Sequence, residues 1–319
     1  MANCKHFLYA QLILPPFFAV FWFCSCALAG PYLFGITIDD PWTEQEAVQQ
    51  ALAAHKVKPT ARIVFDEHVP AAEYLEPVAS IHASSHVMGE ILDSFYVADY
   101  SVDQYLQRTA EYIDTLADRV DIWEIGNEVN GDWLGSNADV RAKIEGAYAL
   151  AEDRGLTTAI NFYYNAACSS DSPEHEMFTW IEHNISQEMK NGLDYVFFSY
   201  YEDDCKGVAY SRDHWQEVFA RLHTIFPGAK LGFGEIGTTD TTKKAAYIQR
   251  YYSITFDKAY YVGGFFWWYY RQDCVPHTAP LWSILDRTVT RAATGGNQPL
   301  PAGSIIPAIN SLLIPPKPD

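Results

Sequence analysis

Two glutamates stand out in this sequence of 319 residues because each ends a short apolar run and is followed by turn residues. Glu128 comes after the run 120–126, with Asn127 directly before it, and Glu235 comes after the run 231–234. Two carboxyl groups held at strand ends are suited to breaking a glycosidic bond. One of them is protonated and releases the sugar leaving group, while the other is ionised and attacks or stabilises the anomeric carbon.

From Tyr32 onward the chain alternates short apolar runs with longer amphipathic segments, the pattern of strands and helices in turn. Strands are predicted at 33–38, 61–65, 86–88, 121–125, 158–162, 195–200, 230–234 and 264–268. Helices are predicted at 44–55, 102–116, 140–154, 174–190, 212–226 and 242–258, with a weaker one at 71–79 and a closing helix near 305–313. Long loops are predicted at 95–101 and 273–301. This order, undivided by a linker, predicts a single-domain α/β fold, a (β/α)8 TIM barrel over residues 30–319.

In such a barrel the loops that follow the strands build the active-site face. Glu128 follows the fourth predicted strand and Glu235 follows the seventh, so their side chains are expected to face each other across the barrel mouth. An isolated Asn-Glu pair is more often an ordinary turn. A second glutamate on the matching strand favours the catalytic interpretation.

These strand-end residues resemble the clan-A glycoside hydrolases, a (β/α)8 group that includes family 5 cellulases and mannanases and family 39 xylosidases. The resemblance implies that Glu128 is the general acid/base, that Asn127 hydrogen-bonds the sugar 2-hydroxyl, and that Glu235 is the nucleophile of a retaining reaction. Two departures prevent assignment to one family. Ser199 stands where the clan often has a histidine, and segment 87–93 lacks the histidine often seen there in family 5.

Arg62 and Tyr201 are the expected supporting residues of this site. Arg62 lies within an apolar strand, where an unpaired cation would be costly, and the resemblance implies Glu235 as its partner. Glu124 shares strand parity with Glu128 and is a competing partner for Arg62. The resemblance implies that Tyr201, which ends the sixth strand, donates a hydrogen bond to Glu235.

Aromatic side chains on the predicted active face are candidates for sugar binding. The resemblance places a tryptophan under the sugar ring at the end of strand eight, and Trp268 is preferred over Trp267 although strand parity does not decide between them. Trp42 and Trp133 follow strands one and four, where a sugar platform and a packing role are equally good interpretations. Tyr200, beside Tyr201, is also expected to contact substrate.

The composition favours a neutral ligand. The net charge of −18 repels polyanions, which argues against nucleic acid, and the aromatic content of 15% mildly favours a sugar. No cofactor or metal is expected, because the chain has no CxxC pair and no zincin motif. The acidic run 202–204 fits either a calcium site or a solvated loop. The expected partner is a neutral β-linked oligo- or polysaccharide, bound by a monomer.

Residues 1–29 are predicted to be a signal peptide. They contain one lysine, Lys5, then the apolar run 7–23 and the small-x-small site 27–29, a better fit to a signal than to a permanent anchor or a lipoprotein at Cys26. The mature protein is therefore expected to be secreted or periplasmic and free of the membrane.

Three cysteines remain in the mature chain, so at most one internal disulfide can form. Cys168 and Cys205 follow neighbouring strands on the same face, which predicts a bridge between them. The alternative bridge joins Cys205 to Cys274.

The sequence thus predicts a secreted retaining β-glycosidase or endo-β-glycanase. A transglycosylase would use the same residues and differ only in the acceptor. A non-catalytic carbohydrate-binding barrel would be expected to lack one of the two glutamates. A metal-dependent hydrolase would need clustered ligands that the strand ends do not supply.

Overall fold

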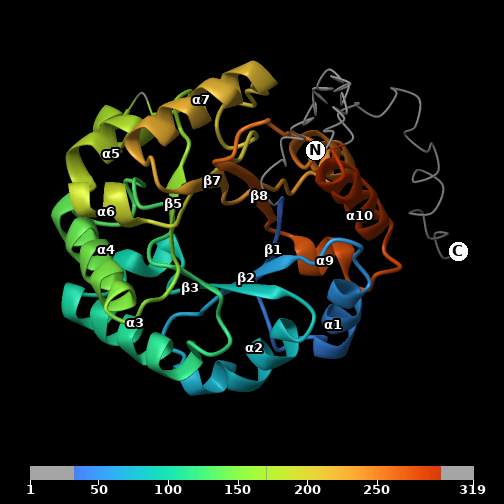
Figure 1. The fold of residues 1–319 in the computed structure, drawn as a ribbon, viewed down its shortest axis with the longest axis horizontal. Coiled ribbons are helices and arrows are strands. Elements are labelled where there is room, and N and C mark those ends of the chain that lie inside the picture. The colour runs from blue at the N-terminus through green and yellow to red at the C-terminus, as the bar shows by residue number, and fades with distance from the viewer. Residues whose placement is uncertain (1–31, 170, 296–319) are drawn as a thin grey trace, which may run out of the picture.

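The computed structural model describes residues 32–169 and 171–295, and within them eight parallel strands close into a barrel in sequence order (Figure 1). The strands are β1 Leu33–Ile38, β2 Thr60–Val64, β3 His86–Glu90, β4 Ile122–Glu124, β5 Thr158–Tyr163, β6 Tyr195–Ser199, β7 Lys230–Phe233 and β8 Tyr261–Trp267. The predicted single-domain (β/α)8 TIM barrel is confirmed. No helix in the described part of the chain is long and apolar enough to cross a membrane.

Helices form an outer ring around the strands (Figure 1). They are α1 Gln45–Ala53, α2 Leu75–His82, α3 Val102–Leu116, α4 Asn137–Glu152, α5 Met177–Asn184, α6 Gln187–Gly192, α7 Arg212–Ile225, α8 Lys244–Tyr251, α9 Tyr270–Cys274 and α10 Pro280–Ala293. Short 3-10 turns lie at η1 Ala71–Tyr74, η2 Ser94–Asp99 and η3 Pro173–His175.

Two predicted segments have a different form in the structure. The helix expected at 174–190 is η3, α5 and α6, because Ile185 is extended and Ser186 starts a new helix by accepting from the Met189 amide. The loop expected at 273–301 contains α10, which begins with proline in its first turn, a position where proline is favourable. The predicted signal peptide and the closing helix near 305–313 lie outside the described residues.

The barrel interior is apolar toward the N-terminal ends of the strands and charged at their C-terminal ends, which form the barrel mouth. Met88, Ile122 and Phe266 belong to the apolar cluster of the lumen. Two positions further along their strands from Met88 and Ile122, Glu90 and Glu124 are fully buried carboxylates. Alternation of side chains along a strand puts each of these glutamates on the luminal face too. The strand geometry therefore stacks a polar layer on an apolar base, at the end where the active face lies.

Strand β8 is irregular, and this sets the direction of its two tryptophans. Its pairing register shifts against both neighbouring strands. Gly264 has a φ of +88°, and a Cβ added to it would lie 2.2 Å from the Phe233 carbonyl oxygen. Only glycine fits such a position without strain. Past this irregularity Phe266 lies in the lumen, so alternation sends Trp267 outward and Trp268 inward.

Candidate active site

Glu235 lies just past the end of β7 and is held by one hydrogen bond and one ion pair. The Tyr201 hydroxyl donates to Glu235 Oε2 at 2.7 Å, and Arg62 Nη2 lies 2.8 Å from Glu235 Oε1. The predicted contacts of Arg62 and Tyr201 with Glu235 are thus both present. The residue before Glu235 is Gly234, which packs directly against Asn161: an added Cβ would lie 2.0 Å from Asn161 Oδ1.

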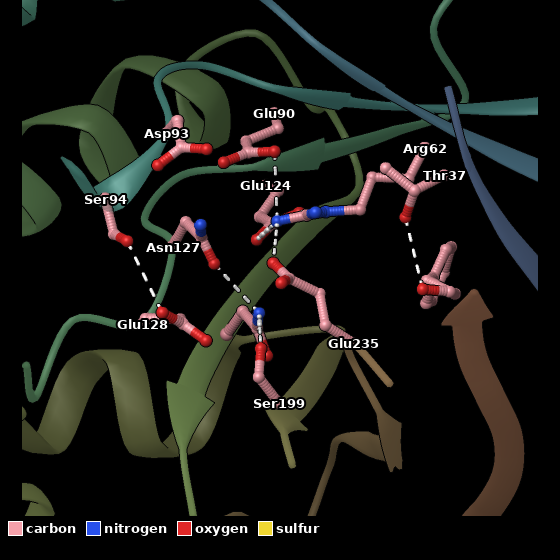
Figure 2. Close-up of polar contacts among 12 residues, drawn as sticks. Thr37, Arg62, Glu90, Asp93, Ser94, Glu124, Asn127, Glu128, Ser199 and Glu235 are labelled. Carbon is pink, nitrogen blue, oxygen red and sulfur yellow. Dashed lines mark hydrogen bonds and ion pairs between the residues drawn. The ribbon is translucent and has the colours of Figure 1, made fainter. Parts of the chain in front are cut away.

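Arg62 is the central cation of the site and is completely buried. Its Nε and Nη2 atoms donate to the two oxygens of Glu124 at 2.5 and 2.9 Å, and Nη2 also lies 3.0 Å from Glu90 Oε2. Figure 2 shows the guanidinium group between the carboxylates of Glu90, Glu124 and Glu235. The competing partner foreseen for Arg62, Glu124, is therefore bonded in addition to Glu235.

Glu128 has a much poorer set of contacts than Glu235. The Ser94 hydroxyl donates to Glu128 Oε2 at a long 3.4 Å, and Glu128 Oε1 is buried with no hydrogen-bond partner among the described residues. The backbone of Glu128 is left-handed, with φ +45°. Strained backbone of this kind in a non-glycine residue is concentrated at functional sites.

The pKa values of Glu128 and Glu235 are both raised, but by unequal sets of neighbours. Burial raises the pKa of Glu128 well above its ordinary value, and the nearby charge of Glu235 raises it further. Burial also raises the pKa of Glu235, but Arg62 and the Tyr201 hydroxyl oppose that rise. In Figure 2 both carboxyl groups are directed into the same space at the barrel mouth.

A hydrogen-bonded amide network that sequence reasoning missed fixes Asn127. Asn161 Nδ2 donates to Asn127 Oδ1 at 2.9 Å and to Ser199 Oγ at 2.8 Å (Figure 2). Asn161 is a lone polar residue in the apolar strand β5, and that was the available signal. Ser199, in place of the clan's histidine, is therefore part of the site through Asn161.

Glu90 is another buried polar residue that the sequence did not single out. Its carboxylate contacts Arg62 Nη2, but neither of its oxygens makes a well-directed hydrogen bond within the described chain. Burial raises the pKa of Glu90 well above its ordinary value, while Arg62 opposes that rise. One guanidinium group thus faces more carboxylates than its single charge can balance.

Of the tryptophans after β8, Trp268 faces the site and Trp267 does not. The Arg62 guanidinium carbon lies 5.9 Å from the centre of the Trp268 ring. Trp267 is fully buried in the outer core, where Nε1 donates to Asp273, so its predicted contact with sugar is wrong. The expectation for Tyr200 is wrong for the same reason: its ring is buried against Trp215 and its hydroxyl donates to the Val208 carbonyl.

Trp133 and Trp42 are both on the active face, 40% and 37% exposed respectively, but only Trp133 is joined to a catalytic candidate. Trp133 Nε1 donates to Ser94 Oγ at 3.2 Å, the same hydroxyl that reaches Glu128. Trp42 packs on Tyr74 with ring centres 4.7 Å apart. Trp133 therefore has the position of a platform beside Glu128, whereas Trp42 lies further out on the rim.

The loop after β6 is fastened by protein contacts. The predicted disulfide between Cys168 and Cys205 is confirmed, with the two Cα atoms 5.2 Å apart. In the acidic run 202–204, Glu202 pairs with Arg250 and Asp203 pairs with Lys243 at 2.7 Å. No cluster of three or more metal-ligating side chains occurs in residues 32–169 and 171–295, so the calcium interpretation of this run gains no support.

Comparison with known proteins gives likeness at the level of structure alone. No protein-family model matches the chain, and no curated protein matches it in sequence. The chain is similar to Saccharomyces cerevisiae Gas2p in complex with laminaripentaose, with 12% identity, a TM-score of 0.53, and coverage of 82% of this chain and 65% of Gas2p.

A second similar structure is a complex of a GH113 beta-1,4-mannanase. It has 12% identity and a TM-score of 0.51, and the match covers 83% of this chain and 99% of the mannanase. The chain spans about two thirds of the length of Gas2p and nearly all of the mannanase. At this identity the likeness bears on the fold, and it agrees with the barrel.

Proposed function

We propose that this protein is a secreted retaining β-glycoside hydrolase that cleaves a neutral β-linked glycan. The observation that carries the proposal is the pair Glu128 and Glu235, two carboxyl groups at one barrel mouth with unequal neighbours, of which Glu235 is buried and Glu128 partly buried. Unequal surroundings are how two carboxyl groups are given opposite protonation states. The two similar structures add support, since one is a β-1,4-mannanase and the other binds laminaripentaose.

Glu235 is the proposed nucleophile. A carboxylate that receives a guanidinium contact and a phenol hydrogen bond is stabilised in its ionised form, which is the form that attacks. In the first step a Glu235 oxygen forms a bond to the anomeric carbon while the bond from that carbon to the leaving oxygen breaks. The product is a covalent glycosyl-enzyme.

Glu128 is the proposed general acid and then the general base. No cation is bonded to it within the described residues, and burial and the nearby charge of Glu235 raise its pKa, so its carboxyl group is favoured in the protonated form. It gives its proton to the leaving oxygen in the first step. In the second step it takes a proton from the water that attacks the anomeric carbon and releases Glu235.

Asn127 is proposed to hold the sugar 2-hydroxyl, because Asn161 ties up its carbonyl oxygen and leaves its amide N–H groups to donate. Trp268 is proposed to lie under the sugar ring, and the Arg62 guanidinium lies over the indole ring at 5.9 Å from its centre. Glu128 Oε1 is an acceptor without a partner among the described residues, available to a substrate atom.

The test is an assay of the purified protein on neutral β-glucans, mannans, xylans and galactans, with reducing ends as the readout. We expect one class to be cleaved by the wild type and none by Glu235→Gln, with circular dichroism showing both proteins folded. Wild-type protein inactive on the whole panel, or Glu235→Gln with near-normal activity, would contradict the proposal.

A transglycosylase would use the same residues and transfer the glycosyl group to a sugar hydroxyl in place of water. Trp133 bears on this choice, because a half-exposed indole joined through Ser94 to Glu128 offers a platform on the side where the acceptor arrives. Product analysis separates the two functions. Products longer than the starting oligosaccharide indicate transfer, whereas only shorter products indicate hydrolysis.

A further inference from the structure

A cavity of ≈ 210 Å³ opens between the loops that follow β6, β7 and β8. Its walls come from Tyr201 and from residues 203–204, 237–239 and 268–269. Pockets for drug-sized ligands are larger, about 300–1,000 Å³. The size of this cavity suits a ligand of one small ring.

The cavity adjoins the proposed catalytic centre through two shared side chains. Tyr201 lines the cavity and also donates to Glu235, and Trp268 lines it with its ring near Arg62. A ligand in the cavity would therefore touch Tyr201, which is bonded to Glu235, and Trp268, which lies beside Arg62. A sugar unit placed there would be next to the unit that reacts.

Aromatic surfaces form part of the wall, and a glycine keeps the space between them open. A Cβ on Gly237 would lie 3.1 Å from the Tyr269 ring and 3.3 Å from the Tyr201 ring. Lys244 Nζ lies 4.6 Å from the centre of the Tyr269 ring and helps to fix it. Aromatic faces of this kind bind the apolar C–H face of a sugar.

The two aspartates of the cavity differ in whether their carboxylates are already used. Asp203 accepts hydrogen bonds from Thr238 at 2.6 Å, Lys243 at 2.7 Å and Tyr247 at 2.8 Å. For the Asp204 carboxylate there is no hydrogen bond or ion pair to any group in residues 32–169 or 171–295. A carboxylate has several acceptor sites and can take two hydroxyl donors at once. Asp204 is therefore the acceptor that the cavity offers to a ligand.

The disulfide fixes the position of Asp204. Cys205, the next residue, is completely buried and bonded to Cys168, which anchors the loop after β6 to the loop after β5. The backbone amides of Asp204 and Cys205 both donate to the Tyr201 carbonyl, at 3.2 and 3.1 Å. The carboxylate is thus presented from a short, fastened turn.

We propose that this cavity is a subsite for one neutral hexose unit of the glycan, adjoining the unit attacked by Glu235, and that Asp204 binds adjacent hydroxyls of that unit. The inference rests on the proposed function and names a substrate-selecting residue for it. Because Asp204 is an unpaired anion beside Asp203, a uronic acid unit would be repelled. The subsite therefore accepts neutral sugars and rejects carboxylated ones.

The first experiment compares wild type with Asp204→Asn on gluco-, manno- and xylo-oligosaccharides of increasing length and on aryl monosaccharide glycosides. We expect KM to rise about tenfold on oligosaccharides that reach the cavity, the value of one charge-assisted hydrogen bond, with kcat nearly unchanged. Aryl glycosides carry a single sugar and leave the cavity empty, so their kinetics should not change. Asp257→Asn, an exposed aspartate in the loop before β8, is the matched control.

Two further variants test charge and anchoring. Asp204→Lys should improve the KM for a C6-carboxylated oligosaccharide relative to its neutral parent. Cys168→Ser combined with Cys205→Ser should reproduce the length-dependent rise in KM. Suppose the wild type cleaves glycans, but Asp204→Asn leaves KM unchanged for both oligosaccharides and aryl glycosides, or raises both KM values equally. The proposed subsite is then overturned. If the wild type cleaves nothing, it is the proposed function that fails.

Discussion

The region around Glu235 and the region around Glu128 share one barrel mouth but contain opposite kinds of neighbours. Glu235 receives a guanidinium contact from β2 and a phenol hydrogen bond from the end of β6. Glu128 receives a long hydroxyl contact from Ser94 in η2, and a hydrogen bond from the Ser199 hydroxyl opposes the rise of its pKa. The comparison teaches that a barrel can give two residues of one type different surroundings, because each lies beside different elements of the fold.

The largest expected effect comes from removing the side chain of Glu128. Glu128→Ala should reduce turnover of natural glycans by about 10²–10⁴-fold, the usual contribution of general acid catalysis. Aryl glycosides with good leaving groups need no proton, so their first step should be much less affected. Azide is an anionic nucleophile that needs no general base, so in the second step it should attack the anomeric carbon in place of water, release Glu235 and restore part of the rate on these substrates.

Kinetics of Glu128→Ala on both substrate types, with and without azide, check this prediction. Glu128→Gln serves as the control for side-chain volume. Equal losses of rate on both substrate types would show that Glu128 does not act as the general acid. The difference between the surroundings of Glu128 and Glu235 would then not reflect an acid and a nucleophile.

Arg62→Lys should have the next largest effect. Lysine keeps the charge but loses the planar fork that reaches both Glu124 and Glu235, and hydrogen bonds to charged groups are worth about 1.5–3 kcal/mol, or roughly 10- to 100-fold in kcat. Thermal unfolding should show a smaller change than the rate. A rate within about twofold of wild type would remove Arg62 from the support of Glu235.

Glu90→Gln should change how stability depends on pH. The folded-state pKa of Glu90 is raised well above its ordinary value by burial, so the folded protein holds this proton at pH values where the unfolded chain has lost it. The associated stability is present at low pH and is lost as the pH rises through the folded pKa. Glutamine has no proton to lose, so the variant should gain stability relative to wild type as the pH increases.

Melting temperatures of wild type and Glu90→Gln across a pH series check this prediction. Asp118→Asn, at an exposed site on the surface, is the control. Parallel curves for wild type and Glu90→Gln would mean that Glu90 carries no proton of its own in the folded protein.

The smallest effect is expected from Ser94→Ala, which removes a hydroxyl that donates to Glu128 and accepts from Trp133. Loss of a neutral hydrogen bond of about 0.5–1.5 kcal/mol should lower kcat a few-fold. Because a donor to the ionised form is lost, the alkaline limb of the pH–rate profile should move to higher pH. An unchanged limb would show that the long Ser94 contact does not influence Glu128.

The fold and the two glutamates could be predicted from sequence because each follows from local periodicity. An apolar run that ends in Asn-Glu or Gly-Glu places its carboxylate at the end of a strand, and strand order then brings the fourth and seventh ends to one mouth. The disulfide between Cys168 and Cys205 followed from the same order.

Other features depended on geometry that periodicity does not encode. The irregularity at Gly264 alters the register of β8, so counting residues could not decide between Trp267 and Trp268. Tyr200 looked like its neighbour Tyr201, but alternation turns it into the outer core. Glu90 belongs to the site only because the fold brings it into contact with Arg62, which its sequence context does not indicate.

Arg62 and Glu124 have no solvent-exposed surface at all, and this has a consequence for work in brine. Dissolved ions weaken attraction between exposed charges, with a screening distance of about 3 Å at 1 M salt, but they act much less on pairs that water cannot reach. The abundant acidic groups on the outside of the chain would be screened, whereas the contacts that hold Glu235 would not. As the salt concentration rises, binding of the protein to a charged surface should therefore change at lower concentrations than the rate of the proposed bond cleavage.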